Sequence, residues 1–151
     1  MNQEITRTAT SVRHFTVLLS PTRRGARLAR RLAVQQLIDW GQPYEAAGQI
    51  VAELAANAAL HGRVAGRDFR LTIRLTGTGT VCVEVTDTRA DLLPHAPEGP
   101  LPEGESGRGL LLVEAYADRW GTEIGPAPCK TVWAEIDQLH HSEPPAARTV
   151  T

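Results

Sequence analysis

Three polar side chains recur along one predicted helix in a pattern that could support phosphoryl transfer. Glu53, Asn57 and His61 are spaced four residues apart, and this spacing places them on one face of a helix. The carboxylate can accept a proton from an incoming hydroxyl group, and the amide oxygen is a hard ligand that suits Mg²⁺. Taken alone, the pattern fits a solvated helix face better, with His61 near the negative end of the helix dipole.

Further features could contact a nucleotide. Asp87 ends a predicted strand, where it could accept a hydrogen bond from the amine of adenine, although an aspartate there more often caps a turn. Residues 104–110 (Gly-Glu-Ser-Gly-Arg-Gly-Leu) form a glycine-rich turn before a predicted helix, where free backbone N–H groups can bind phosphate. The turn lacks the Gly-Lys-Ser/Thr of a P-loop. Thr131 could reach the adenine edge, but alone it is better explained as a β-favouring residue.

Two helices are predicted in the first half of the chain, where apolar residues repeat at spacings of three and four. Ser20 and Pro21 suit the N-cap and the first position of the first helix, and Gly41 ends it. The second helix starts near Pro43 and stops at Gly62, a good C-cap residue. It carries the polar face described above beside an apolar stripe.

Strands dominate the rest of the pattern. Residues 69–76 and 81–86 alternate apolar and polar side chains, which predicts an antiparallel hairpin with one buried face. The prolines and glycines of residues 88–106 exclude a regular element, and so long a loop in a compact domain usually has a function, such as covering a ligand. The order of elements predicts an α/β (α+β) fold, a two-layer sandwich of a mixed β-sheet with helices on one face. The other predicted elements are strands over 12–19, 119–124 and 131–136 and a helix over 109–118.

Composition narrows the class of protein. The 151 residues predict one domain, and the net charge of −1 argues against a direct nucleic-acid binder. The sequence contains no signal peptide or membrane-spanning run, so we expect a cytoplasmic protein that does not bind membranes. We expect a flexible N-terminus over 1–11, one nucleotide-binding domain over 12–138 and a disordered tail over 139–151.

The motifs, taken in order, are more specific than any one of them. The run from Glu53 to Gly62 resembles the N-box of the GHKL (histidine-kinase-like) ATPase family, and Asp87 stands where the first glycine box of that family begins. Residues 107–110 resemble the second glycine box, and Thr131 matches a threonine near the final strand. Over residues 12–137 the sequence is most similar to the anti-sigma factor serine/threonine kinase branch of this family, of the actinobacterial type.

The resemblance implies ATP and Mg²⁺ as cofactors and assigns roles to the matching residues. Glu53 would be the general base and Asn57 a Mg²⁺ ligand, while Asp87 would bond adenine. The backbone of Gly107 and Gly109 would hold phosphate groups, and charge and position make Arg108 a further phosphate contact. The implied nucleotide site as a whole consists of Asn57, Asp87, Gly107, Arg108, Gly109, Leu110 and Thr131.

The sequence departs from the family after Asp87. The family pattern there is Asp-x-Gly-x-Gly, but residues 87–91 read Asp-Thr-Arg-Ala-Asp, so both glycines are missing. The backbone after Asp87 therefore cannot follow a path that requires positive φ angles. Cys129, just before Lys130, also stands where related sequences often have glycine.

The resemblance predicts an anti-sigma-type regulator, a protein serine/threonine kinase that phosphorylates an anti-sigma antagonist. The implied partners are a sigma factor, the antagonist, or both, and family members often form homodimers. The alternative is a catalytically weak or inactive ATP-binding module that sequesters a partner, which the missing glycines favour and Glu53 disfavours. A third alternative, the ATPase domain of a sensor histidine kinase, is disfavoured because no dimerisation helix pair precedes residue 12.

Overall fold

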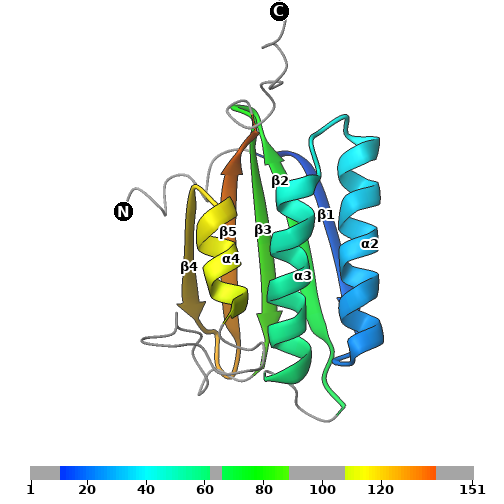
Figure 1. Cartoon of the computed structure of the whole chain (residues 1–151). Coiled ribbons are helices and arrows are strands. Elements are labelled where there is room, and N and C mark those ends of the chain that lie inside the picture. The colour runs from blue at the N-terminus through cyan, green and yellow to red at the C-terminus, as the bar shows by residue number, and fades with distance from the viewer. Residues whose placement is uncertain (1–10, 62–65, 89–107, 139–151) are drawn as a thin grey trace, which may run out of the picture.

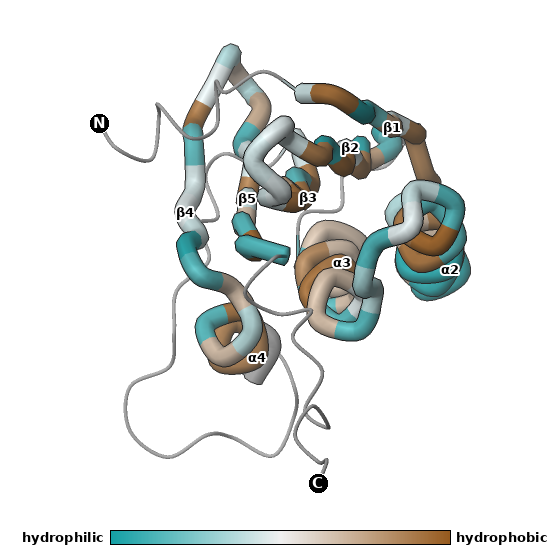
Figure 2. The backbone as a smooth tube through the Cα atoms, turned by 90° about the horizontal axis from the view of Figure 1, so that it is seen from above, coloured by the Kyte–Doolittle hydropathy of each residue, from teal (hydrophilic) through white to brown (hydrophobic). Residues whose placement is uncertain are grey.

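The computed structural model describes residues 11–61, 66–88 and 108–138. Its three helices lie side by side over one face of a single sheet (Figures 1 and 2). This arrangement confirms the predicted two-layer α+β sandwich. The elements in chain order are β1 (Ser11–Leu19), α2 (Arg23–Asp39), α3 (Glu45–Leu60), β2 (Phe69–Thr76), β3 (Thr80–Asp87), α4 (Arg108–Tyr116), β4 (Arg119–Ile124) and β5 (Lys130–Asp137).

The sheet has the strand order β1-β2-β3-β5-β4, and every adjacent pair is antiparallel. The expectation of a mixed sheet was therefore wrong for the described strands. The reason lies in the position of β5. Strands β3 and β4 run in the same direction and are connected through α4, but β5 lies between them and pairs antiparallel with both. The parallel pair that such a crossover usually creates is thereby separated.

Helix α2 begins two residues later than the sequence suggested. Its N-cap is Thr22, whose side-chain oxygen accepts a hydrogen bond from the backbone N–H of Gly25 at 3.0 Å. Ser20 precedes the helix, and its hydroxyl group lies 3.0 Å from that of Thr22. A Cβ atom on Gly25 would lie 2.0 Å from the carbonyl oxygen of Ser20. This close turn, which only glycine allows, moves the capping role from Ser20 to Thr22.

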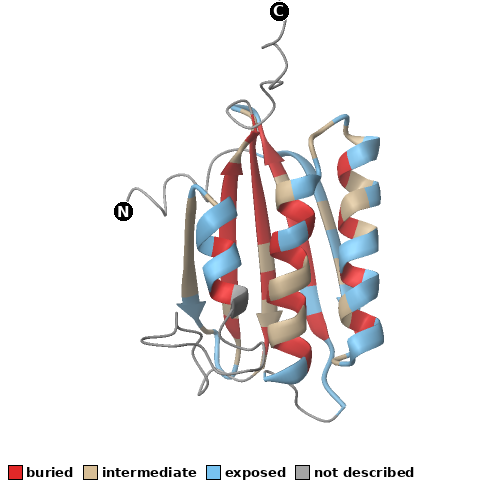
Figure 3. Ribbon diagram, viewed as in Figure 1, coloured by how far each residue is buried: buried red, intermediate tan, exposed pale blue. Residues whose placement is uncertain are grey.

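Helix α3 lies between α2 and α4 and is the central helix of the core (Figures 1 and 3). Its packing side is rich in alanine, so it approaches the sheet closely. Gly48 also brings it close to α2, because a Cβ atom there would lie 3.1 Å from the Cγ2 atom of Val34. No helix in the described part of the chain is long and apolar enough to cross a membrane. The buried residues of α3 are Ala47, Gly48, Ile50, Val51, Leu54, Ala55, Ala58 and Ala59.

The two faces of the sheet differ in chemistry. The face under the helices is apolar, whereas the opposite face carries polar cross-strand pairs. Thr16 and Thr72 share a hydrogen bond of 2.6 Å between their hydroxyl groups. Arg74 of β2 forms an ion pair with Glu84 of β3. The predicted hairpin is confirmed with this alternation, and the side chains that β2, β3 and β5 bury under the helices include Phe69, Leu71, Ile73, Val81, Val83, Val85, Ala134 and Ile136.

Several expectations fall on other parts of the chain. The tail predicted over 139–151 and the loop predicted beyond Thr88 lie outside the described residues. So does the N-terminal segment, except Ser11, which begins β1. The domain boundaries proposed from the sequence therefore stay predictions.

Candidate functional site

Most of the candidate residues occur at one end of the sandwich. At this end β3 finishes at Asp87, β5 starts at Lys130, and α4 begins at Arg108 (Figure 1, lower end). Asp87 and Lys130 are directly opposite each other in the β3–β5 ladder. Helix α3 runs toward the same end and contacts both β3 and α4. Residues from four elements that are distant in sequence are therefore brought to one edge.

Glu53 and Asn57 lie on the side of α3 that faces away from α2. Gly48 faces α2, and Asn57 follows it by nine residues, which is two and a half helical turns. Asn57 is thus on the opposite side of α3, which is the side of α4, and Glu53 lies one turn before it. Both side chains are half-buried, and neither has a hydrogen-bond partner among the described residues. The two groups are available to a ligand between α3 and α4.

Burial changes the acidity of Glu53. Partial removal of its carboxyl group from water disfavours the charged form and raises the pKa of Glu53 above its ordinary value. A carboxylate with a raised pKa is a stronger base, which suits a group that must take a proton from a hydroxyl. His61 does not share this environment, since it is the exposed C-cap residue of α3.

Asp87 forms a buried ion pair that the sequence analysis missed. Its Oδ2 atom lies 3.3 Å from Nζ of Lys130, and both side chains are only 7% exposed. Asp87 is on the helix-covered face of the sheet, because it alternates with Thr86, which is on the other face. The attraction between the two groups offsets part of the cost of burying each charge in a place that disfavours an isolated one.

A sequence signal for this pair did exist. Lys130 is the only lysine of the chain, and it alternates with Val132 and Ala134 on the apolar side of its strand. A lysine in an apolar register usually has a buried partner. The partner could not be named, however, until the pairing of β5 with β3 was known.

Thr131 is separated from the other candidate residues. Its hydroxyl group lies 2.7 Å from that of Thr86, its partner across the β3–β5 ladder. Its neighbours Lys130 and Val132 point to the helix layer, so Thr131 points to the opposite face of the sheet. The structure gives its side chain a cross-strand bond, and its assignment to a nucleotide site stays a prediction.

The glycine-rich turn is described only from Arg108 onward. Gly107 lies outside the described residues, and Arg108 and Gly109 are the first two residues of α4. Leu110 is 2% exposed and contributes to the core instead of the surface. The N-terminus of α4, with its positive dipole end, is thus directed to the same edge as Asp87.

The residues present fit a magnesium ion that is bound together with phosphate groups. No group of three or more His, Cys, Asp or Glu side chains forms a metal site within the described ranges. Asn57 offers one amide oxygen. Mg²⁺ typically takes one or two protein ligands and completes its shell with phosphate oxygens and water. A single asparagine beside a helix N-terminus is therefore a sufficient protein contribution.

Comparisons with known proteins agree with this geometry. The family described as histidine kinase-like ATPase domain matches residues 19–136. The fold is similar to the crystal structure of the RsbU and RsbW domains of Rv1364c from Mycobacterium tuberculosis, with a TM-score of 0.61 and 21% sequence identity. That match covers 83% of this chain but only 32% of the other chain. A search of the curated proteins gives no significant match.

Proposed function

Because the chain belongs to the histidine kinase-like ATPase family, we propose that it binds Mg²⁺-ATP between α3 and α4 and phosphorylates a protein partner. The observation that carries this proposal is the pair of half-buried side chains on α3. Glu53 and Asn57 are one turn apart and face α4, without partners among the described residues. Simple nucleotide binding needs a metal ligand and phosphate contacts, but it does not need a base at Glu53.

Each residue has a defined part in the transfer. Asn57 would give its amide oxygen to Mg²⁺, which neutralises charge on the phosphate groups when bound. The start of α4 would direct backbone N–H groups to those phosphates. As the γ-phosphorus forms a bond to the serine or threonine oxygen and its bond to ADP breaks, Glu53 would accept the hydroxyl proton.

The adenine ring of ATP would be held at the edge of the sheet. Asp87 would accept a hydrogen bond from the amine of adenine, and the contact with Lys130 would hold this carboxylate in position. The resemblance to anti-sigma kinases leads us to propose a cytoplasmic regulator whose partner is a sigma factor or an anti-sigma antagonist. The similar structure contains an RsbW domain, which agrees with such a fold.

A second candidate function is a sequestering module with little or no catalytic activity. The missing glycines after Asp87 favour it, because a chain without them cannot follow a backbone path that requires positive φ angles. Both candidate functions include ATP binding, but only the first includes transfer of the γ-phosphoryl group to a partner.

The test compares Glu53→Gln with Asn57→Ala and with the control Glu45→Gln, which makes the same chemical change at an exposed position of the same helix. Calorimetry with Mg²⁺-ATP measures binding. Asn57→Ala should weaken it, while both glutamine variants should bind like wild type. Phosphoproteomics of the proteins retained from native lysate measures transfer, which should fall by roughly 10²–10⁴ in Glu53→Gln and stay at the wild-type level in Glu45→Gln.

The outcomes separate the proposals. No heat with Mg²⁺-ATP would refute nucleotide binding. Binding by wild type without phosphorylation of any retained protein would support the sequestering module. Equal transfer by wild type and Glu53→Gln would remove Glu53 from the mechanism.

A further inference from the structure

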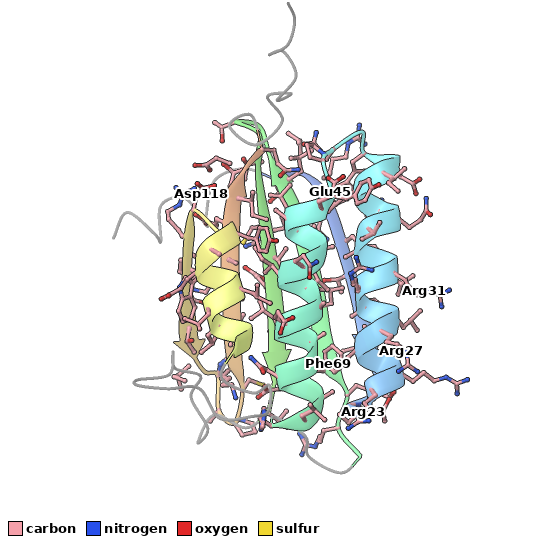
Figure 4. The ribbon with its side chains drawn as sticks, viewed as in Figure 1. Arg23, Arg27, Arg31, Glu45, Phe69 and Asp118 are labelled. Carbon is pink, nitrogen blue, oxygen red and sulfur yellow. The ribbon has the colours of Figure 1, made fainter. Side chains whose placement is uncertain are left out.

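The outer side of α2 carries a dense positive charge. Five arginines occur within the nine residues from 23 to 31. The helix packs through Ala29, Ala33 and Leu37, which are fully buried. Figure 4 shows the side chains of Arg23, Arg27 and Arg31 along the outer flank of α2, directed away from the rest of the molecule. We use the name arginine face for the exposed residues Arg23, Arg24, Arg27, Leu28 and Arg31.

Within the described residues, no acidic side chain neutralises this charge. None of these arginines forms an ion pair with a described residue. The only acidic residue of α2 is Asp39, at its far end, where it accepts a hydrogen bond from Gln35 at 3.1 Å. The charges of the arginine face are therefore directed to solvent.

The placement of the arginines also works against the helix itself. Arg23 is the first residue of α2 and Arg24 the second, so both lie at the positive end of the helix dipole. Arg23 and Arg27, and likewise Arg27 and Arg31, are like charges four residues apart, which repel. A helix selected only for stability would have acidic residues in its first turn, and α2 has none. The pattern indicates a use outside the folded chain.

An apolar residue lies within the arginine face. Leu28 is 42% exposed, with Arg24 one turn before it and Arg31 almost one turn after it. Arginine is enriched among the residues that dominate protein–protein binding energy, and the centre of an interface is more apolar than its rim. The face extends about 12 Å along the helix from Arg23 to Arg31, the length of roughly two turns.

We propose that the arginine face docks an acidic segment of a protein partner, with an apolar side chain of that segment against Leu28. Charge complementarity selects the acidic chemistry, and Leu28 favours a protein over nucleic acid. The chain as a whole carries a net charge of −1, which would repel the extended phosphate backbone of a nucleic acid beyond this one helix. A bilayer is disfavoured because the apolar side of α2 is buried in the core. This inference does not depend on nucleotide binding.

The test uses a labelled helical peptide in which glutamates are spaced around one leucine, and a second peptide with lysines in place of the glutamates. Anisotropy measures their binding to the full chain. Arg27→Glu/Arg31→Glu reverses two charges of the arginine face. Its matched control, Arg67→Glu/Arg70→Glu, changes the net charge equally. Arg67 and Arg70 are both exposed, and both lie outside α2.

We expect the glutamate peptide to bind wild type in a 1:1 complex that salt weakens. The Arg27→Glu/Arg31→Glu variant should lose roughly tenfold or more in affinity and gain affinity for the lysine peptide, while the control should change about twofold or less. Leu28→Ala should cost about fivefold, the effect of a moderate interface residue. Circular dichroism and Mg²⁺-ATP binding should be unchanged in both double variants.

Other results would overturn the proposal. Equal losses in the two double variants would mean that only net charge matters. Tighter binding of duplex DNA, or of phosphatidylserine vesicles, with the same dependence on Arg27 and Arg31 would replace the protein partner by those ligands. Sedimentation that shows self-association of wild type, lost in Arg27→Glu/Arg31→Glu, would identify a second copy of the chain as the occupant.

Discussion

The arginines of α2 and the arginine that begins β4 show two different uses of the same side chain. Arg119 donates hydrogen bonds to Glu135 at 2.7 Å and to Asp137 at 2.6 Å, and it is about two-thirds buried. The arginines of the arginine face have no ion-pair partner among the described residues. In the sheet, charge is part of the folded structure. On α2, the charges instead oppose the helix dipole and one another.

Breaking an ion pair of the sheet should therefore lower the free energy of unfolding substantially. We expect the largest effect from Lys130→Met, which leaves Asp87 buried beside an apolar side chain. Breaking a buried pair by removing one partner costs about 3–5 kcal/mol of unfolding free energy. Chemical denaturation measures the loss. Asp87→Asn/Lys130→Met is the control and should recover much of it, and a double variant as unstable as the single one would contradict the explanation.

Arg119→Met should come next. It leaves the carboxylate of Glu135, a residue that is 0% exposed, without its arginine. We expect a loss of about 3 kcal/mol, at the lower end of the range, because the Arg119 side chain is 32% exposed and water can partly replace it. Adding Glu135→Gln should restore stability. If Arg119→Met unfolds at the same denaturant concentration as wild type, the network does not contribute to stability.

The α2 arginines should behave in the opposite way. Arg24→Glu removes a positive charge from the first turn of α2 and places a negative charge at the positive end of the dipole. The variant should be more stable than wild type by roughly 0.3–1 kcal/mol at low salt, and the gain should shrink as salt rises. Thermal unfolding at two salt concentrations is the measurement. A destabilised variant would show that Arg24 has a structural partner and would end the contrast with Arg119.

Substitution of Glu53 should give the smallest change in stability. It tests whether a charge at the candidate site, like those of α2, lowers the stability of the fold. Its folded pKa is raised by burial, so the stability that it contributes is present below its unfolded pKa and is lost as pH rises through the folded pKa. Glu53→Gln removes this loss. The variant should be more stable than wild type at pH 7 by about 0.5 kcal/mol or less, with no difference in acid below the unfolded pKa. If the stability difference between Glu53→Gln and wild type were larger in acid than at pH 7, it would contradict a raised pKa of Glu53.

Local patterns were sufficient to predict the elements but not their partners. The alternation in residues 69–76 and 81–86 predicted the hairpin, because one face of a sheet must be buried. The capping residue of α2 was wrong by two positions, since Ser20 and Thr22 are both good caps and the choice depends on a contact at Gly25. The prediction of a mixed sheet was wrong, because the direction of strand pairing depends on where β5 inserts.

The candidate site shows the same limit. Helical spacing was enough to place Glu53 beside Asn57. The pairing of Asp87 with Lys130 joins residues that are distant in sequence and follows only from the β3–β5 ladder. Strand alternation alone puts Thr131 on the other face from Lys130, so the sequence already contained the reason to separate the two.

The insertion of β5 between β3 and β4 has a consequence for how the molecule assembles. Strands β1, β2 and β3 are consecutive in space, and with α2 and α3 they can form before the rest of the chain is available. Among the described strands, β4 pairs with β5 alone, so we expect it to join the sheet when the later strand is in place. We expect the β1–β3 half to gain amide-exchange protection first during refolding, and β4 and β5 to gain it together as one cooperative unit.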